Sequence, residues 1–203
     1  MPKIVTEEER ANVRHLIIQA AAEEFARVGF EQAKMEVISE KAGIGKGTVY
    51  LHFNSKQALF SAMLKEIAGE QLSELRQALQ PVANQPLKKK LQVLMETFNR
   101  LITGQPEGFR VFISSLYGVN RQFKLEAAEH RRAFLTLIED LLKEALQTGE
   151  IKVPVEPASL LILNACESLA LLAGSLGFDT DFVQENQNLI VNMLYSGLKL
   201  EKQ

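Results

Sequence analysis

Apolar residues recur along almost the whole chain with the spacing of α-helices, and no run alternates apolar and polar residues as a half-buried strand would. The first helix is the clearest case, because Thr6 and Glu9 fit a capping box at its start and Gly29 supplies a stop signal. The apolar residues between them fall on one stripe and are Val13, Ile17, Ala21, Phe25 and Val28. The sequence therefore predicts an all-α fold.

Eight further helices follow from the same periodicity, and glycine or proline marks most of their ends. They are expected at about 34–42, 45–53, 56–79, 87–103, 106–117, 120–148, 157–176 and 180–200. We expect two domains in this nine-helix chain, with the seam in the fourth helix. Residues 1–55 would form a three-helix DNA-binding domain, and residues 56–203 a helical domain for effector binding and dimerisation.

Composition places the chain among globular proteins, since 46% hydrophobic and 24% charged residues are near the usual averages. Cys166 is the single cysteine, so neither an internal disulfide nor a multi-cysteine zinc site can form. No apolar targeting run precedes Thr6, which favours a cytoplasmic protein. The apolar stretch 160–176 is interrupted by Asn164, Glu167 and Ser168, which favours a buried helix over a membrane span.

The most informative stretch is 35–53, where two short helices flank the turn Ala42-Gly43-Ile44. Such a pair is typical of a helix-turn-helix, whose second helix can enter the major groove of DNA. Many helical hairpins of this kind bind nothing, so the pattern alone does not establish DNA binding. The net charge of −2 argues against a nucleic-acid partner, and residues 34–56 carry only four lysines against two glutamates.

The residues themselves are more specific than the pattern. They are Ile17, Ala21, Phe25, Gly29, Met35, Ile38, the run from Ala42 to Phe53 (AGIGKGTVYLHF), Ser55, Lys56 and Leu59. Together they closely resemble the N-terminal domain of the tetracycline-repressor (TetR) family. The resemblance implies a repressor of transcription that binds double-stranded operator DNA and is released by a small molecule. Gly45 departs from the family, where serine is common, so a hydroxyl that could touch phosphate is missing.

The chemistry of the third helix fits that role. A helix N-terminus presents unpaired N–H groups and a positive potential to phosphate, and Gly45 and Gly47 leave this end unobstructed. Thr48 and Tyr50 carry hydroxyls, and Lys46 can reach a base edge or a phosphate. The expected DNA contacts are Lys34, Gly45, Lys46, Gly47, Thr48, Tyr50, His52 and Lys56.

Several of these assignments have a structural alternative. Thr48 and Tyr50 could be packing residues, and a lone histidine such as His52 is as often structural as functional. Val49 and Phe53 lie on the opposite face and are expected to be core.

The middle helices carry aromatic and sulfur-containing side chains that could line an effector cavity. They are Met95, Phe98, Phe109, Phe112, Tyr117, Phe134 and Cys166. Such a stripe is more often ordinary core. A cavity there would be mainly apolar with few polar groups, such as Tyr117, Asn164 and Glu167, and would favour an apolar or aromatic effector.

The last two helices are expected to form a homodimer interface. The helix at 157–176 is apolar nearly all round, so it must be covered on every side. Paired with the last helix it would suit a four-helix bundle made by two chains, and the TetR resemblance implies the same pair. The expected interface residues are Leu169, Ala173, Phe182, Ile190, Met193 and Leu194.

An enzyme is the first alternative, but its parts are missing from the sequence. His15, His52 and His130 fall in separate helices, and no glycine-rich phosphate loop follows a strand. We therefore expect no catalytic residue, no metal and no cofactor. A protein-binding helical module is the second alternative, which salt-dependent DNA binding would separate from a DNA reader.

Overall fold

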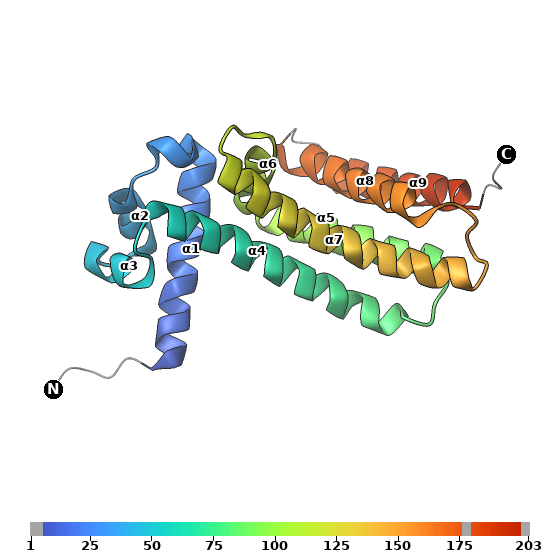
Figure 1. Cartoon of the computed structure of the whole chain (residues 1–203), viewed down its shortest axis with the longest axis horizontal. Helices are drawn as coiled ribbons and strands as arrows, with labels where there is room; N and C mark the ends of the chain where they lie inside the picture. Colours follow the sequence, from blue (N-terminus) through green and yellow to red (C-terminus); the bar gives the residue numbers. More distant parts are fainter. Residues whose placement is uncertain (1–5, 176–179, 200–203) are drawn as a thin grey trace. The chain divides into compact units, whose positions relative to one another are not determined.

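The structure of the chain is a computed structural model that describes residues 6–175 and 180–199, which are almost entirely helical (Figure 1). The helices are α1 (Glu7–Gln32), α2 (Met35–Ala42), α3 (Lys46–His52), α4 (Lys56–Leu79), α5 (Leu87–Gly104), α6 (Pro106–Tyr117), α7 (Arg121–Gln147), α8 (Val155–Ser175) and α9 (Thr180–Gly197). A short 3-10 helix, Gln80–Val82, follows α4. No strand occurs in the described residues. The predicted nine-helix, all-α fold is confirmed.

Local sequence signals determine where α1 begins and where it breaks. The Thr6 hydroxyl accepts a hydrogen bond from the Glu9 N–H (3.1 Å), and the Glu9 carboxylate accepts one from the Thr6 N–H (3.0 Å). Gly29 has φ 76° and ψ 168°, so the helix breaks there and one further turn follows up to Gln32. The predicted capping box is thus present, and the predicted stop at Gly29 is a break inside α1 rather than its end.

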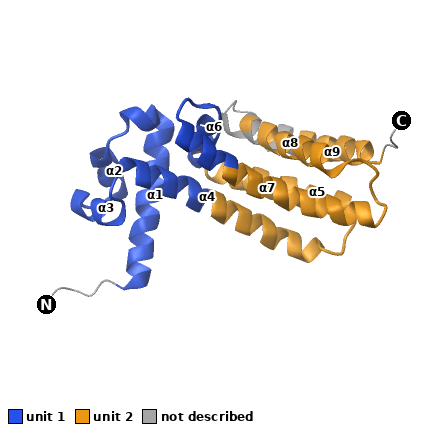
Figure 2. Cartoon of the chain, in the orientation of Figure 1, with its two compact units in different colours: residues 1–67, 107–128 blue, residues 68–106, 129–203 orange. Residues whose placement is uncertain are grey.

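The helices gather into two compact units (Figure 2). Unit 1 comprises residues 1–67 and 107–128, and unit 2 comprises residues 68–106 and 129–203. Both α4 and α7 contribute to each unit, and α6 packs with the N-terminal helices. These units describe packing, so a functional boundary between residues 55 and 56 stays a prediction.

Unit 1 is built on a core of aliphatic and aromatic side chains that holds α3 in place. Four phenylalanines meet in it, with ring centroids 4.1 Å apart for Phe60 and Phe123 and 4.9 Å apart for Phe25 and Phe60. Val49 of α3 and Phe53 just after it are buried in the same core. Each buried side chain of this size stabilises the fold by about 1.5–3 kcal/mol, so α3 is firmly attached.

Unit 2 is built on α5, α7, α8 and α9, and one carboxylate joins three of its segments. Glu150 follows α7, and its Oε1 accepts hydrogen bonds from the Leu87 N–H (2.8 Å) and the Tyr195 hydroxyl (2.9 Å). The start of α5 and the end of α9 are therefore held at the same end of the unit. None of the helices among residues 6–175 and 180–199 has the length and apolar character of a membrane span.

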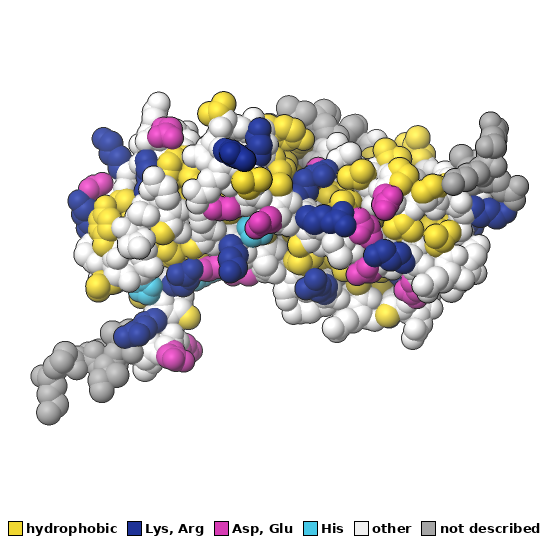
Figure 3. Space-filling view, in the orientation of Figure 1, with side chains coloured by type: hydrophobic (Ala, Val, Ile, Leu, Met, Phe, Trp, Pro, Cys, Tyr) yellow, Lys and Arg dark blue, Asp and Glu magenta, His cyan; other side chains and the backbone are white. Residues whose placement is uncertain are grey.

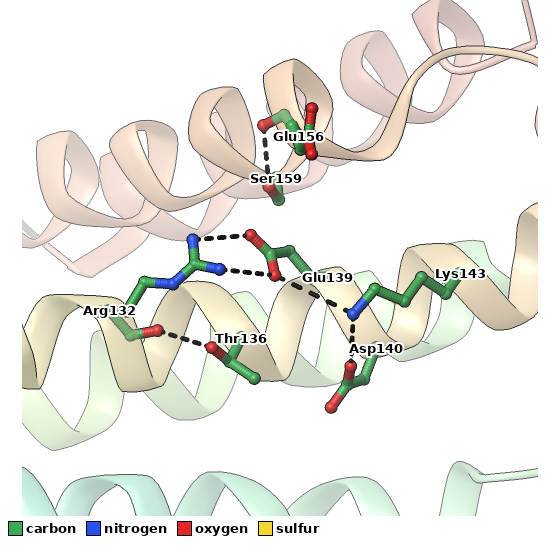
Figure 4. Close-up of polar contacts among 7 residues, drawn as sticks. All are labelled: Arg132, Thr136, Glu139, Asp140, Lys143, Glu156 and Ser159. Atoms are coloured by element: carbon green, nitrogen blue, oxygen red, sulfur yellow. Dashed lines mark hydrogen bonds and ion pairs between the residues drawn. The ribbon is translucent and has the colours of Figure 1, made fainter.

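Polar groups buried in unit 2 are mostly paired, as the contacts of α7 in Figure 4 illustrate. The carboxylate of Glu139 is buried, and the Arg132 guanidinium donates to its two oxygens at 2.9 and 3.2 Å. On α8 the buried Ser159 hydroxyl donates to the Glu156 carbonyl oxygen (2.9 Å). A buried charge held in this way costs far less than an unpaired one.

Candidate DNA-binding site

The turn between α2 and α3 is fixed by backbone hydrogen bonds. Gly43 has φ 66° and ψ 24°, a left-handed conformation that favours glycine. Its N–H donates to the Glu40 carbonyl, and the Ile44 N–H donates to the Ser39 carbonyl, so α2 ends in a Schellman motif. Gly45 then caps α3. The two helices and their three-residue turn form a helix-turn-helix.

The two faces of α3 differ sharply in exposure. Val49 and Phe53 are buried, as the sequence predicts, and the Arg14 guanidinium lies 4.6 Å from the Phe53 ring centroid. Tyr50 is 42% exposed. The glycine, lysine and threonine positions from 45 to 48 are exposed as well. The face that carries donors for phosphate therefore points away from the core of unit 1.

Lys46 forms an ion pair across the turn with Glu36 of α2. The hydrogen bond from Lys46 holds the pKa of the Glu36 carboxyl below its usual range, and the same bond raises the pKa of Lys46. The Lys46 ammonium also lies 6.0 Å from the Tyr50 ring centroid. Lys46 is thus charged and is held at the outer face of the helix-turn-helix.

The other expected lysines differ in their surroundings. The Lys56 ammonium donates to the carbonyl oxygens of Glu31 (2.9 Å) and Ala33 (3.0 Å), so it joins the start of α4 to the end of α1. Two of its three donors are therefore occupied inside the protein. Lys34 is exposed just before α2, and His52 is half-buried at the end of α3.

Leu51 is the outer residue of α3 that the sequence analysis missed. Its side chain is 86% exposed, and it follows Tyr50 on the surface of the helix. Its position was readable, because Val49 and Phe53 mark the buried stripe and Leu51 lies half a turn from it. An exposed leucine on this face is able to contact a thymine methyl group.

The expected effector residues do not form one cluster within either unit. In unit 2, Met95, Phe98, Phe134 and Cys166 are buried, and the Phe98 and Phe134 rings lie edge to face with centroids 6.0 Å apart. Burial raises the pKa of the Cys166 thiol to about 12.

The remaining expected effector residues lie in unit 1. The rings of Phe109 and Phe112 are stacked with centroids 6.4 Å apart, whereas Tyr117 is 79% exposed and so lines no enclosed cavity. Of the polar groups considered for the cavity, Asn164 and Glu167 both accept hydrogen bonds from Arg131, so their acceptors are already engaged.

The start of α8 and the end of α9 enclose an apolar groove of about 500 Å³. Leu161 is 62% exposed and Met193 is 65% exposed, and hydrophobic side chains are visible over α8 and α9 in Figure 3. The groove is lined by Val153, Pro154, Pro157, Ala158, Leu161, Met193, Leu194, Gly197 and Leu198.

Among the expected interface residues, Met193 and Leu194 line this groove and Ile190 is half-buried. Leu169 is buried within the chain itself, where it offers no surface to a partner, so we leave it out of the proposed interface. Ala173 and Phe182 lie outside the residues whose side chains the structure describes.

An all-helical fold with an exposed helix-turn-helix and a second helical unit defines the class of helical DNA-binding regulators. Residues 17–63 match the family model of bacterial regulatory proteins of the tetR family, and residues 84–171 match a tetracyclin repressor-like C-terminal domain. The chain belongs to the TetR family.

Similar proteins include the fatty acid metabolism regulator protein of Bacillus subtilis, 28% identical over 136 residues that cover 67% of this chain and 69% of that protein. The transcriptional regulator UidR of Escherichia coli K12 is 27% identical over 169 residues, covering 81% of this chain and 82% of UidR. Among solved structures, FadR from Bacillus subtilis in complex with stearoyl-CoA has a TM-score of 0.78 at 24% identity, covering 90% of this chain and 98% of that one. FadR from Bacillus halodurans has a TM-score of 0.79 at 22% identity, covering 92% and 96%.

These relatives are transcriptional regulators rather than enzymes. The chain is a DNA-binding transcriptional regulator that responds to a small molecule, as the sequence predicts.

Proposed function

We propose that this protein is a homodimeric repressor that binds a palindromic operator through α3 and leaves it when a long-chain acyl thioester binds in unit 2. The observation that carries the DNA contact is the outward face of α3. Its exposed residues from Gly45 to Tyr50 combine a free helix N-terminus with a lysine and two hydroxyls, while Val49 anchors the helix.

In this proposal, residues of α3 divide into those that position the protein and those that read bases. The N-terminus of α3, with Thr48 and Tyr50, binds phosphate oxygens and sets the register. Lys46 and Leu51 reach the major groove, where a lysine can bond guanine and an apolar side chain can contact the thymine methyl group. Lys34 adds a phosphate contact from the start of α2.

A second copy of the chain is the proposed occupant of the groove between α8 and α9. Its walls are almost wholly apolar, and Leu161 and Met193 leave hydrophobic surface in water that a symmetric partner would cover. The family's typical dimerisation supports this choice. Two-fold symmetry would present two copies of α3 to two half-sites of one operator in the cytoplasm.

The effector class rests on similarity and on chemistry together. A relative is named for fatty acid metabolism, and the structure of a similar regulator holds stearoyl-CoA. The buried interior of unit 2 around Phe98 and Phe134 is mainly apolar, as an acyl chain requires. Release follows if the acyl thioester binds more tightly to the conformation that fits DNA less well.

Fluorescence anisotropy tests the proposal directly, using the full chain and labelled DNA from upstream of its own gene. We expect stearoyl-CoA to release the protein at micromolar concentration, and coenzyme A alone to leave the complex intact. Tight DNA binding that stearoyl-CoA does not weaken would contradict the effector class and leave the DNA-binding proposal in place.

A further inference from the structure

Gln187 of α9 is an exception to the pairing of buried polar groups in unit 2. Its side chain is 1% exposed, and among the described residues neither its amide oxygen nor its amide nitrogen has a hydrogen-bond partner. By contrast, the buried Lys90 ammonium lies 2.9 Å from a Glu144 oxygen, and the buried Glu139 carboxylate is bonded by Arg132. Leaving a buried polar group unpaired destabilises the fold, so a helix has little reason to keep a glutamine there unless something binds it.

The spacing of residues along the helices shows which residues of the neighbouring helices of unit 2 lie at the same level as Gln187 along the helix axes. Leu161 of α8 and Leu194 of α9 line the same groove, and these consecutive helices pack together as an antiparallel pair (Figure 1). The two helices run in opposite directions and rise equally per residue. Moving along both helices from the groove toward their connection therefore places Gln187 at the level of Cys166 and Leu169.

The register of α5 leads to the same level. Leu87 at the start of α5 and Tyr195 near the end of α9 both bond the Glu150 carboxylate, and α5 packs against both α8 and α9. Two turns along each helix from this point, Gln187 is level with Met95, and Phe98 follows one turn further along α5. The Phe98 ring in turn contacts Phe134.

This level of unit 2 is mainly apolar, and two amides near it have unpaired buried atoms: Gln187, and Asn99 one turn beyond Met95 on α5. Ligand pockets are lined mainly by apolar and aromatic side chains, with a few polar groups that orient the ligand. Asn164 and Glu167 have their acceptors engaged by Arg131, whereas both amide atoms of Gln187 are available. Among the described residues, the unpaired oxygen of Asn99 can only accept a hydrogen bond, whereas Gln187 also has an unpaired amide nitrogen, so the donor that would orient a ligand carbonyl belongs to α9.

We propose that Gln187 is a specificity-determining residue of the effector site, which binds an apolar ligand bearing a carbonyl group. The amide nitrogen donates a hydrogen bond to the ligand carbonyl oxygen, and the amide oxygen accepts one from an N–H or hydroxyl of the same ligand where it has one. This inference rests on the proposed function, since the thioester carbonyl of a long-chain acyl-CoA is such a group.

The first test needs no ligand. Gln187→Met keeps the length of the side chain and removes both unpaired polar atoms, so we expect the melting temperature of the free protein to rise by about 2–4 °C. Val191→Ala, one turn further along the buried face of α9, is the matched control and should lower it. A fall in melting temperature for Gln187→Met would show that the amide is bonded within the fold and would overturn the proposal.

The second test measures the stearoyl-CoA concentration that releases half of the operator DNA. We expect it to rise about tenfold in Gln187→Met and to stay unchanged in Val191→Ala. An unchanged value in Gln187→Met, with the wild type responding, would overturn the role of Gln187 and leave the proposed function standing. If the wild type does not respond, the acyl-CoA effector is wrong, and the melting temperature alone decides: a rise supports a carbonyl-bearing ligand of another kind, and a fall overturns the inference.

Discussion

The ammonium group of Lys46, in the first turn of α3, forms an ion pair with Glu36, in the first turn of α2. Both side chains are about half exposed, so the pair adds little to the stability of the fold. Its importance lies in DNA binding, because residues 34–56 carry only a small excess of lysine over glutamate. Glu36 competes with phosphate for one of the few cations on this face.

Glu36→Gln should therefore strengthen binding to non-specific DNA about three- to tenfold and steepen its dependence on salt, since Lys46 becomes free to pair with phosphate. Anisotropy against a scrambled duplex at two salt concentrations measures both effects. Glu40→Gln is the matched control, because Glu40 is also exposed on α2 and its replacement by glutamine removes the same charge. Equal gains in DNA affinity in both variants would show that Glu36 acts only through its contribution to the net charge.

Dimerisation should depend on the groove between α8 and α9. Met193→Asp places a charge in the proposed apolar interface, so we expect sedimentation to show monomers that bind operator DNA at least tenfold more weakly. Leu125→Asp tests a leucine of unit 1 that is also more than half exposed, and it should leave the dimer intact. An intact dimer for Met193→Asp would place the interface elsewhere.

Acid stability should depend on Glu24, whose buried carboxylate accepts two hydrogen bonds from Arg27 and lies 3.4 Å from the Lys41 ammonium. The bonds from Arg27, with a smaller contribution from Lys41, hold its pKa below the usual value despite its burial. A carboxyl whose pKa is lower in the folded state stabilises the fold above the unfolded pKa, and this stabilisation disappears as the pH falls through the folded pKa.

Glu24→Gln should thus lower the free energy of unfolding at pH 7 by about 1–2 kcal/mol and have a smaller effect below about pH 4. Urea denaturation at the two pH values measures this difference. An equal loss of stability at both pH values would mean that the side chain acts through packing rather than charge.

Cys166 should be inert in the folded protein, because burial raises its thiol pKa to about 12 and the thiolate is the reactive form. At pH 8 we expect a thiol reagent to label it only after denaturant is added. Rapid labelling without denaturant, at a rate typical of a free thiol, would show that water reaches this part of unit 2.

The sequence was a good guide where local signals decide structure. The capping box of Thr6 and Glu9, the left-handed glycine at Gly43 and the buried stripe of Val49 and Phe53 need only neighbouring residues, and α4 was predicted to the residue. The break at Gly29 was also readable. The short turn after it depends on the phenylalanine core, where Phe30 packs against Phe60.

Contacts between distant segments were out of reach. The bonds of Lys56 to the carbonyls of Glu31 and Ala33 depend on how α4 meets α1, and the pairing of Lys46 depends on the angle between α2 and α3. The unpaired amide of Gln187 is invisible in sequence, since a glutamine on α9 reads as an exposed residue until its neighbours are known.

The measurement that tests the central claim most directly is operator binding by variants of the outer face of α3. Anisotropy with the full chain and its own upstream DNA should give nanomolar affinity for the wild type, falling steeply with salt. Tyr50→Ala, Lys46→Ala and Leu51→Ala should each weaken binding at least tenfold without loss of helicity, while Lys89→Ala, on exposed α5 surface, should not. Unchanged affinity in all three α3 variants, or a folded wild type that binds its upstream DNA no better than a scrambled duplex, would contradict the claim that α3 reads the operator.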